Sequence, residues 1–393
     1  MQYSYIIYYL FAIIIFSAVY WKWYVDLLSP PRRLYYFYHG FKARQKTFCP
    51  TVLKEKNDTK RLIYLLPYIA ASFTPVILII QKQKLILSSL GYLYWRVLDT
   101  FDDLLVGEER KKSLRILHDR LQRLQQNGFA SRNVEIDGFD FLNVGPRDEI
   151  YIYIVKTIER FDSVFLQLNE AYQDVLVRLV KHQTSYFFAI SHKYFKTEQQ
   201  YHNKCVSSIM TGLYFATFEV NRSLYGYKMD KETQKLLEDT CESFATGNII
   251  KDLEKDFRQG ISYHPELVPR GIIEEIRSDE FEKINEAREF LTYRGIRHLP
   301  TTCKMFKNEW NEGFIVKLMA LLLKTYLVNN YRKYLSGIKQ ETFENIDTKR
   351  LFVGCLFATL WDWESEIVEL DQEMLSWRPN AQPLWGGRNH IEA

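Results

Sequence analysis

The chain has 393 residues, of which 47% are hydrophobic and 25% charged, so it can bury a large core and is not intrinsically disordered. Its formal net charge of +4 is small for this length, which argues against a dedicated nucleic-acid-binding protein. The five cysteines are widely spaced and include no CxxC pair, which excludes a disulfide framework and a zinc motif. The unusual property is an aromatic content of 16%, which fits either a deep apolar cavity or a densely filled core.

The N-terminal segment predicts a membrane anchor. Residues 1–21 carry no charge, and a helix needs about 20 apolar residues to cross a bilayer. A spanning helix within residues 1–28 is favoured over a cleaved signal peptide, because no basic leader precedes it and no small-residue cleavage site follows. Basic residues dominate the linker at 29–60, so the positive-inside rule predicts a single-pass protein with a cytoplasmic body, at the endoplasmic reticulum if eukaryotic. A packed N-terminal helix of the soluble fold is the alternative.

Residues 61–375 predict an all-α domain, followed by a tail at 376–393. Leucines recur at helical spacing from Leu114 to Leu124, and the alternation typical of strands is scarce. A second uncharged stretch, 62–81, contains Pro67 and Pro75, and we expect a buried helix pair there. The polar, glycine-containing stretch 126–149 indicates a surface insertion.

A first acidic cluster, Asp99-Thr-Phe-Asp102-Asp103, follows Arg96. Residues four apart share a helix face, so Asp99 and Asp103 point the same way. The flanking residues are apolar, and carboxylates in apolar surroundings require a cation or an ion pair. Mg²⁺ takes one or two carboxylates together with phosphate oxygens, so the cluster is a candidate metal site, with a solvated acidic face as the alternative.

A second cluster repeats oxygen donors at every fourth position: Asn248, Asp252 and Asp256. Lys251 lies off this stripe. If the two clusters face each other across a helical bundle, they hold divalent ions between them. Such ions make a diphosphate a good leaving group, and departure from an allylic carbon leaves a carbocation that aromatic faces stabilise. Candidate wall residues, each also explicable as ordinary core, are Tyr92, Tyr94, Phe187, Phe188, Tyr214, Phe215 and Phe218.

These motifs resemble the squalene/phytoene synthase family, and most closely the eukaryotic squalene synthases. The family carries D-x-x-E/D-D and N-x-x-R-D-x-x-E-D, and residues 99–103 and 248–256 fill those places. The similarity extends over roughly residues 60–340, including the Ser-Phe pair at 72–73, the Arg-x-Leu-Asp-Thr run at 96–100 and the Arg-His-Leu-Pro run at 297–300.

The resemblance implies an all-α isoprenoid synthase bundle that uses Mg²⁺ to ionise an allylic prenyl diphosphate, farnesyl or geranylgeranyl diphosphate. Squalene synthases join two such molecules head to head and reduce the product with NADPH. By resemblance, the metal ligands are Asp99, Asp102, Asp103, Asn248, Asp252 and Asp256; the substrate-binding residues are Arg96, Lys251, Ser72 and Phe73; and the catalytic residues are Tyr201, Arg96 and Tyr92.

The chain departs from the family pattern at several positions. Lys251 and Lys255 stand where arginine and glutamate are usual, and Ala70-Ala71 replaces the family's Ser-Arg pair, which removes a phosphate-binding guanidinium. Lys204 precedes Cys205 where the family has its catalytic tyrosine, so either Tyr201 serves or that tyrosine is lost. The run Phe-Ile-Val-Lys-Leu-Met at 314–319 replaces the family's Phe-Cys-x-Ile-Pro-Gln near the reductive pocket, which leaves NADPH use open.

Three hypotheses follow. The first is a membrane-anchored head-to-head prenyl synthase of the squalene type. The second is a class I terpene synthase that cyclises or quenches a single prenyl diphosphate. The third is a non-catalytic scaffold on the same fold. The sequence predicts no nucleic-acid partner and leaves the oligomeric state open.

Overall fold

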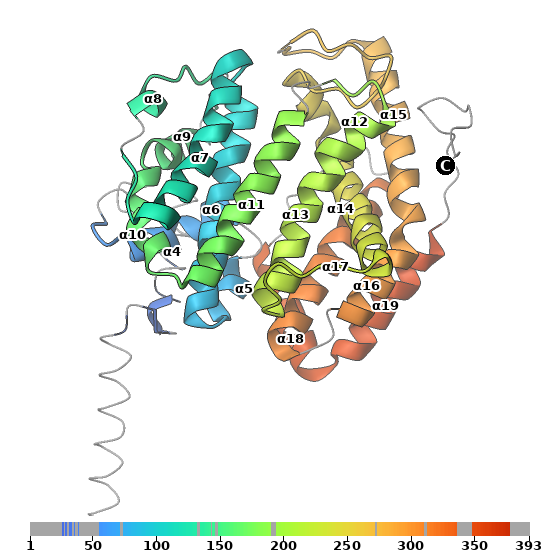
Figure 1. Cartoon of the computed structure of the whole chain (residues 1–393). Coiled ribbons are helices and arrows are strands. Elements are labelled where there is room, and N and C mark those ends of the chain that lie inside the picture. Colours follow the sequence, from blue (N-terminus) through green and yellow to red (C-terminus); the bar gives the residue numbers. More distant parts are fainter. Residues whose placement is uncertain are drawn as a thin grey trace, which may run out of the picture. The chain divides into compact units, whose positions relative to one another are not determined.

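The computed structural model describes residues 55–377 except 71–73, 132–133, 143, 146–147, 190–193, 272, 310–312 and 336–347, together with Asp26, Leu28, Ser29, residues 31–33, Tyr35 and Tyr38. These residues form helices, without a named strand; the nearest approach to a sheet is an isolated bridge between Tyr194 and Ser262. The predicted all-α class is confirmed for this part of the chain. Figure 1 shows the helices in sequence order.

The chain divides into two compact units. The first comprises residues 1–106 and 119–176, and the second comprises residues 107–118 and 177–393. Two helices pass from one unit to the other, α7 (Gly107–Asn127) and α11 (Glu170–Ala189). The boundaries predicted from sequence for the anchor, linker, body and tail stay predictions.

The first unit is built around α6, the helix that carries the first acidic cluster. α6 spans Lys82–Leu104 and packs against α4 (Asp58–Ile69), α5 (Thr74–Ile79) and α9 (Asp148–Lys156). The Asn57 side chain caps the start of α4 by accepting from the Lys60 amide at 2.9 Å. The uncharged stretch thus forms α4 and α5, and α4 is buried over most of its length despite Pro67, as expected for a buried helix pair. The remaining helices are α8 (Val134–Asp137), η2 (Ile158–Phe161) and α10 (Asp162–Leu166).

The second unit is organised around α14, which spans Lys231–Arg258 and carries the second cluster. The Asp230 side chain caps its start by accepting from the Thr233 amide at 2.7 Å. In Figure 1, α14 runs among the helices against which it packs, α13 (Ser207–Tyr214), α15 (Ser278–Arg297), α16 (Leu299–Glu309) and α17 (Gly313–Leu335). The other elements are α12 (Glu198–Tyr201), η3 (His202–Val206), η4 (Phe215–Asn221), α18 (Thr348–Trp361) and α19 (Trp363–Ser376).

A buried polar network locks α14 against α15 and α17. The Tyr331 hydroxyl donates to the Ser243 carbonyl at 2.9 Å and lies 2.5 Å from the Thr246 hydroxyl. Ser243 in turn donates to the Gly295 carbonyl at 3.1 Å. Glycine at 295 permits this close approach, because an added Cβ would lie 1.6 Å from the Tyr331 hydroxyl. The network therefore fixes the helix on which the second cluster sits.

Two predictions concern parts of the chain outside this description. The predicted anchor at 1–28 includes residues 1–25, and Ser72 and Phe73 also lie outside the described residues. Within the described part, every helix is too short or too polar to cross a bilayer. The four described cysteines, Cys205, Cys241, Cys303 and Cys355, are free thiols.

Candidate functional site

One face of α14 presents the three predicted oxygen donors. Asn248, Asp252 and Asp256 follow one another at every fourth position of an unbroken helix and are all partly accessible. The Asp252 side chain is 43% exposed. Glu254, between them in sequence, instead pairs with the buried Arg288 at 2.9 Å. The carboxylate of Glu254 is therefore engaged in an ion pair between α14 and α15, whereas Asn248, Asp252 and Asp256 are the side chains that could bind a cation.

Tyr326 from α17 orders the first donor. Its hydroxyl donates to the Asn248 side-chain oxygen at 3.0 Å and accepts from Lys251 Nζ at 2.5 Å. The Lys251 ammonium also lies 3.9 Å from the Asp252 carboxylate. Since the hydroxyl occupies the Asn248 oxygen through a hydrogen bond, one lone pair of that oxygen remains for a cation. A positive charge also stands beside the stripe, where an anionic substrate would bind.

Asp256 ends the stripe in a less polar environment. The Tyr263 hydroxyl donates to its carboxylate at 3.2 Å. Burial, together with the nearby Asp252 carboxylate, raises the pKa of Asp256 to about 6. The carboxylates of Asp252 and Asp256 repel each other, and burial of Asp256 adds to the cost of its charge. A divalent cation bound between them would offset both effects, as expected for a pair of metal ligands.

The first cluster lies in the first unit, on the last turns of α6. Arg96 forms an ion pair with Asp99, and its guanidinium lies 4.9 Å from the centre of the Tyr151 ring. Burial lowers the pKa of Arg96, but the Asp99 carboxylate outweighs it and the net shift is upward. Asp103 is exposed, whereas Asp102 is buried and 5% exposed. Asp99 and Asp103 are therefore the accessible members of this cluster.

The two clusters belong to different units, so the predicted meeting of the two stripes stays a prediction. Within the described residues, no three His, Cys, Asp or Glu side chains converge as a ready metal centre. This donor set fits Mg²⁺ nevertheless, because Mg²⁺ keeps several waters and is bound through one or two carboxylates plus substrate phosphates. The α14 stripe offers such a pair in Asp252 and Asp256, beside a neutral oxygen.

The predicted catalytic tyrosine, Tyr201, is fully buried at the end of α12. The Arg294 guanidinium lies 5.4 Å from its ring centre, and burial raises the pKa of the Tyr201 phenol well above its ordinary value. Lys204 follows within the π-helix η3, a rare distortion that is frequent at functional sites. Tyr92 lies on α6, where burial raises the pKa of its phenol.

The candidate wall aromatics are mostly core residues. The structure buries Tyr94, Phe187, Phe215 and Phe218. The Tyr214 hydroxyl is bound to the Tyr227 carbonyl at 2.7 Å. For these side chains ordinary packing is a sufficient explanation.

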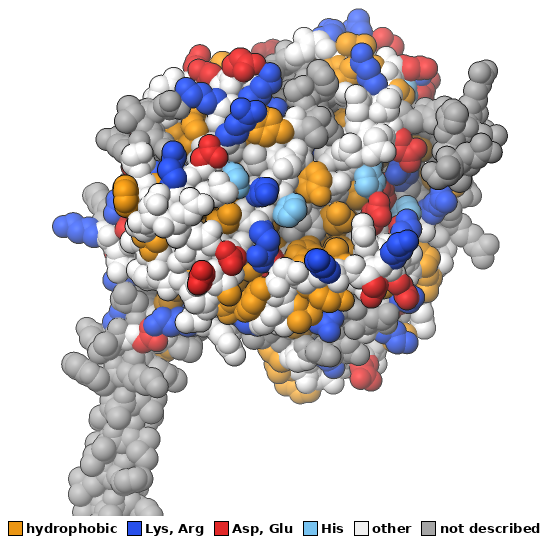
Figure 2. All heavy atoms as spheres, in the orientation of Figure 1, with side chains coloured by type: hydrophobic (Ala, Val, Ile, Leu, Met, Phe, Trp, Pro, Cys, Tyr) orange, Lys and Arg blue, Asp and Glu red, His pale blue; other side chains and the backbone are white. Residues whose placement is uncertain are grey.

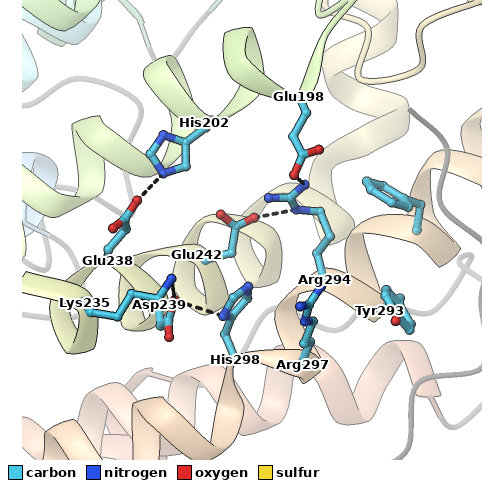
Figure 3. A pocket seen from close by; sticks show the side chains of 11 residues that line it. Glu198, His202, Lys235, Glu238, Asp239, Glu242, Tyr293, Arg294, Arg297 and His298 are labelled. Carbon is cyan, nitrogen blue, oxygen red and sulfur yellow. Dashed lines mark hydrogen bonds and ion pairs between the residues drawn. The ribbon is translucent and has the colours of Figure 1, made fainter. Parts of the chain in front are cut away.

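Figure 3 draws a polar pocket of about 390 Å³ in the second unit, beside the N-terminal half of α14. Its dashed lines join Arg294 to Glu242 and Glu198, Asp239 to Lys235 and His298, and His202 to Glu238. Burial opposes ionisation of Asp239, but the hydrogen bonds from His298 and Lys235 outweigh it and lower the pKa of Asp239 to about 2. Because the pocket's own carboxylates neutralise most of its cations, the α14 stripe is the stronger candidate for a diphosphate site.

Sequence reasoning missed Tyr326 and Tyr263. Tyr263 lies in the loop seven positions after Asp256, whereas Tyr326 has no neighbouring motif and lies 78 positions from the asparagine that it contacts. Only the packing of α17 on α14 brings the two together.

The comparisons with known proteins rest on structure. No family model matches the chain, and no curated protein matches it in sequence. A squalene synthase, TcSQS, solved with the ligand E5700, aligns with a TM-score of 0.55 at 15% identity, over 82% of this chain and 98% of that one. TcSQS with the ligand BPH1237 aligns with a TM-score of 0.53 at 16% identity, over 81% and 97%. The chain thus has the all-α isoprenoid synthase fold.

Proposed function

We propose that this chain is a prenyl-diphosphate enzyme that ionises an allylic diphosphate with Mg²⁺ and condenses two molecules head to head, as squalene synthases do. The observation that carries the proposal is the α14 face, where an oriented asparagine oxygen precedes two neighbouring carboxylates. A merely solvated acidic face has no need of a neutral oxygen held by Tyr326. Similarity in fold to TcSQS supports the same class of reaction.

Each residue has a role in this proposal. Mg²⁺, when bound, neutralises the diphosphate and makes it a better leaving group. Asp252, Asp256 and Asn248 supply oxygen ligands on α14, and Asp99, Asp103 and the buried Asp102 are the candidates on α6. Lys251 and Arg96 bind diphosphate oxygens, Arg96 as a planar double donor and Lys251 as a point charge.

Tyr201 is the candidate catalytic tyrosine. Because burial raises the pKa of its phenol, the group stays protonated at neutral pH. It therefore acts as a hydrogen-bond donor or proton donor rather than as a resting base. The Arg294 guanidinium fixes the ring from one side, and it is itself paired with Glu242 at 2.7 Å. Tyr92 and the pair Ser72 and Phe73 stay substrate-contact candidates by resemblance.

A specific contact favours the second hypothesis, a terpene synthase acting on one prenyl diphosphate without a reductant. Lys317 lies in the run that replaces the family's reductive segment. Its ammonium lies 4.6 Å from the Trp363 ring centre, and its carbonyl accepts from the Trp363 indole at 2.9 Å. The segment thus packs α17 onto α19. NADPH is therefore the least supported of the expected cofactors.

We also propose that the enzyme is a single-pass membrane protein held by residues 1–28, with its body in the cytoplasm. The support is the uncharged segment followed by the basic linker.

The test is turnover of the full-length protein with farnesyl or geranylgeranyl diphosphate, Mg²⁺ and NADPH. Diphosphate release reports ionisation, and product identity separates the hypotheses: a C30 or C40 hydrocarbon supports condensation, and a C15 or C20 cyclic product or alcohol supports the terpene synthase. Asp99→Ala and Asp252→Ala are each expected to lower turnover at least about 100-fold, a loss of roughly 2.7 kcal/mol in transition-state stabilisation.

Glu232→Ala is the matched control. Glu232 also lies on α14, but it is 74% exposed and pairs with Lys304 on the surface. Its removal should leave turnover unchanged, because exposed ion pairs contribute little. Undiminished turnover in Asp252→Ala would refute the metal assignment, and absence of diphosphate release from the wild type would leave the scaffold hypothesis.

A further inference from the structure

Helix α18 leaves large apolar side chains in solvent. Residues 351–361 carry no charge, and a helix that is apolar on all sides normally lies inside a core or a membrane. Here Val353, Phe357, Leu360 and Trp361 are 47%, 52%, 55% and 72% exposed. In Figure 2 hydrophobic side chains gather at the lower edge of the view, where Figure 1 draws α18. A face of this size and composition is typical of an interaction surface.

These four residues form one stripe, because they stand at helix positions i, i+4, i+7 and i+8. The Phe357 and Trp361 rings stack, with centroids 5.1 Å apart and planes 14° apart, which gives the stripe a fixed aromatic ridge. Gly354 lies beside the ridge, and an added Cβ there would meet nothing within 4 Å. The exposed face of α18 therefore combines two protruding aromatic rings, Phe357 and Trp361, with open space above Gly354.

The two ends of α18 carry opposite charge. Lys349 and Arg350 stand in the first turn, and the exposed Asp362 directly follows the last; the exposed Glu364 and Glu366 come next, in the first turn of α19. The helix dipole adds partial positive charge to the basic end and partial negative charge to the acidic end. Such a helix is complementary to an antiparallel copy of itself.

We propose that two copies of this chain associate by antiparallel pairing of α18. With Phe357 packed over Gly354 of the second copy, the twofold axis passes between positions 355 and 356. The same register places position 350 opposite position 361 of the second copy and position 349 opposite position 362, so the basic end of one helix lies beside the acidic end of the other. The inference is independent of the proposed enzymatic function.

The size of the surface predicts a weak dimer. α18 has 14 residues, so it is about 21 Å long. One helix pair buries less than the about 800 Å² per partner of a standard interface. A lipid surface is the less suitable occupant, because the three carboxylates beside Trp361 are repelled by anionic lipids.

The experiment is sedimentation equilibrium of the full-length protein in mild detergent over a wide range of concentrations. The wild type should form a dimer that dissociates on dilution, with a dissociation constant in the micromolar range. Phe357→Asp should weaken association at least about 100-fold. Phe281→Asp is the matched control, since Phe281 is 41% exposed on α15 and lies off the stripe, and it should leave association unchanged.

Charge exchange tests the antiparallel register. Lys349→Asp and Asp362→Lys should each weaken the dimer severalfold, and the two together should restore it, because the register places these two positions opposite each other. Within one copy Lys349 stands in the first turn of α18 and Asp362 directly follows its last residue, so restoration requires a contact between copies. A monomer at every concentration overturns the proposal, as does a dimer that Phe357→Asp leaves intact. A monomer whose Trp361 is quenched by brominated phosphatidylcholine also overturns it and identifies lipid as the occupant.

Discussion

Gly295→Ala tests whether the close contact between α15 and α17 holds the second unit together. The new methyl group would lie 1.6 Å from the Tyr331 hydroxyl, 2.2 Å from Thr246 Oγ1 and 2.6 Å from Tyr331 Cζ. Tyr331 is 0% exposed, so its ring has no solvent into which to swing. Either the ring shifts and loses its bonds to Ser243 and Thr246, or α15 moves away from α14.

The expected cost follows from three contributions. Overpacking a core by one methyl group costs about 1–3 kcal/mol. Stranding the buried Tyr331 hydroxyl adds about 1–3 kcal/mol. Replacing glycine by alanine within a helix returns about 1 kcal/mol. We therefore expect a net destabilisation of roughly 3 kcal/mol, near the middle of the range that these contributions span.

The assay is urea unfolding followed by circular dichroism at 222 nm. Gly354→Ala is the matched control, because Gly354 also lies within a helix but faces open space. At position 354 the higher helix propensity of alanine is the only effect of the substitution, so the free energy of unfolding of the monomeric protein should rise by about 0.5–1 kcal/mol. Tyr331→Phe combined with Gly295→Ala should recover part of the loss. If Gly295→Ala and the wild type have the same free energy of unfolding, the close contact at Gly295 does not contribute to stability and the reasoning fails.

Two further predictions concern the polar groups of α14. Tyr326→Phe removes the hydroxyl that bonds Asn248 and Lys251, and we expect the Mg²⁺ concentration for half-maximal turnover to rise about tenfold, with little change in the urea midpoint. The pKa of Asp239 is lowered from 3.8 to about 2, so its ionised form stabilises the fold above pH 4 and that stabilisation disappears as the pH falls towards 2. Asp239→Asn should therefore be less stable than wild type at pH 5 and nearly equal to it at pH 2; a gap that stays constant with pH would contradict this.

The all-α class could be predicted from sequence because it depends on local periodicity. Leu114, Leu117, Leu121 and Leu124 are all buried on α7, as their spacing indicates. The end of that helix is local too, since Gly128 adopts a left-handed φ of 72°. The division into two units was not predictable in this way, because it depends on contacts between residues far apart in the chain.

The candidate site was predictable only where spacing along one helix decides it. Asn248, Asp252 and Asp256 share a face because α14 is unbroken through them. Which acidic residues stay available depends on tertiary partners: Glu254 is taken by Arg288, and Asp102 is buried on α6. No pattern within α14 indicates that α17 supplies Tyr326. The meeting of the two clusters stays a prediction for the same reason.

Two departures from the family pattern lie in segments that the resemblance links to steps after ionisation. Lys317 covers Trp363 in the segment that stands in place of the family's reductive one. Lys204 lies in a π-helix three positions after Tyr201, and the resemblance places the family's tyrosine at one of these two positions. Lys251 replaces an arginine next to the metal stripe, but it keeps a positive charge there and gains a partner in Tyr326. Lys251 thus preserves the positive charge beside the stripe, whereas Lys255 and Ala71 change the charge at two other positions of the family pattern. If Lys204 rather than Tyr201 takes the place of the family's tyrosine, diphosphate release should be retained more fully than head-to-head condensation, since a lysine ammonium is a poor substitute for a phenol beside a carbocation. The ratio of released diphosphate to C30 or C40 product in a single assay measures that difference directly. A ratio of two diphosphates per hydrocarbon would show that the departures leave condensation intact.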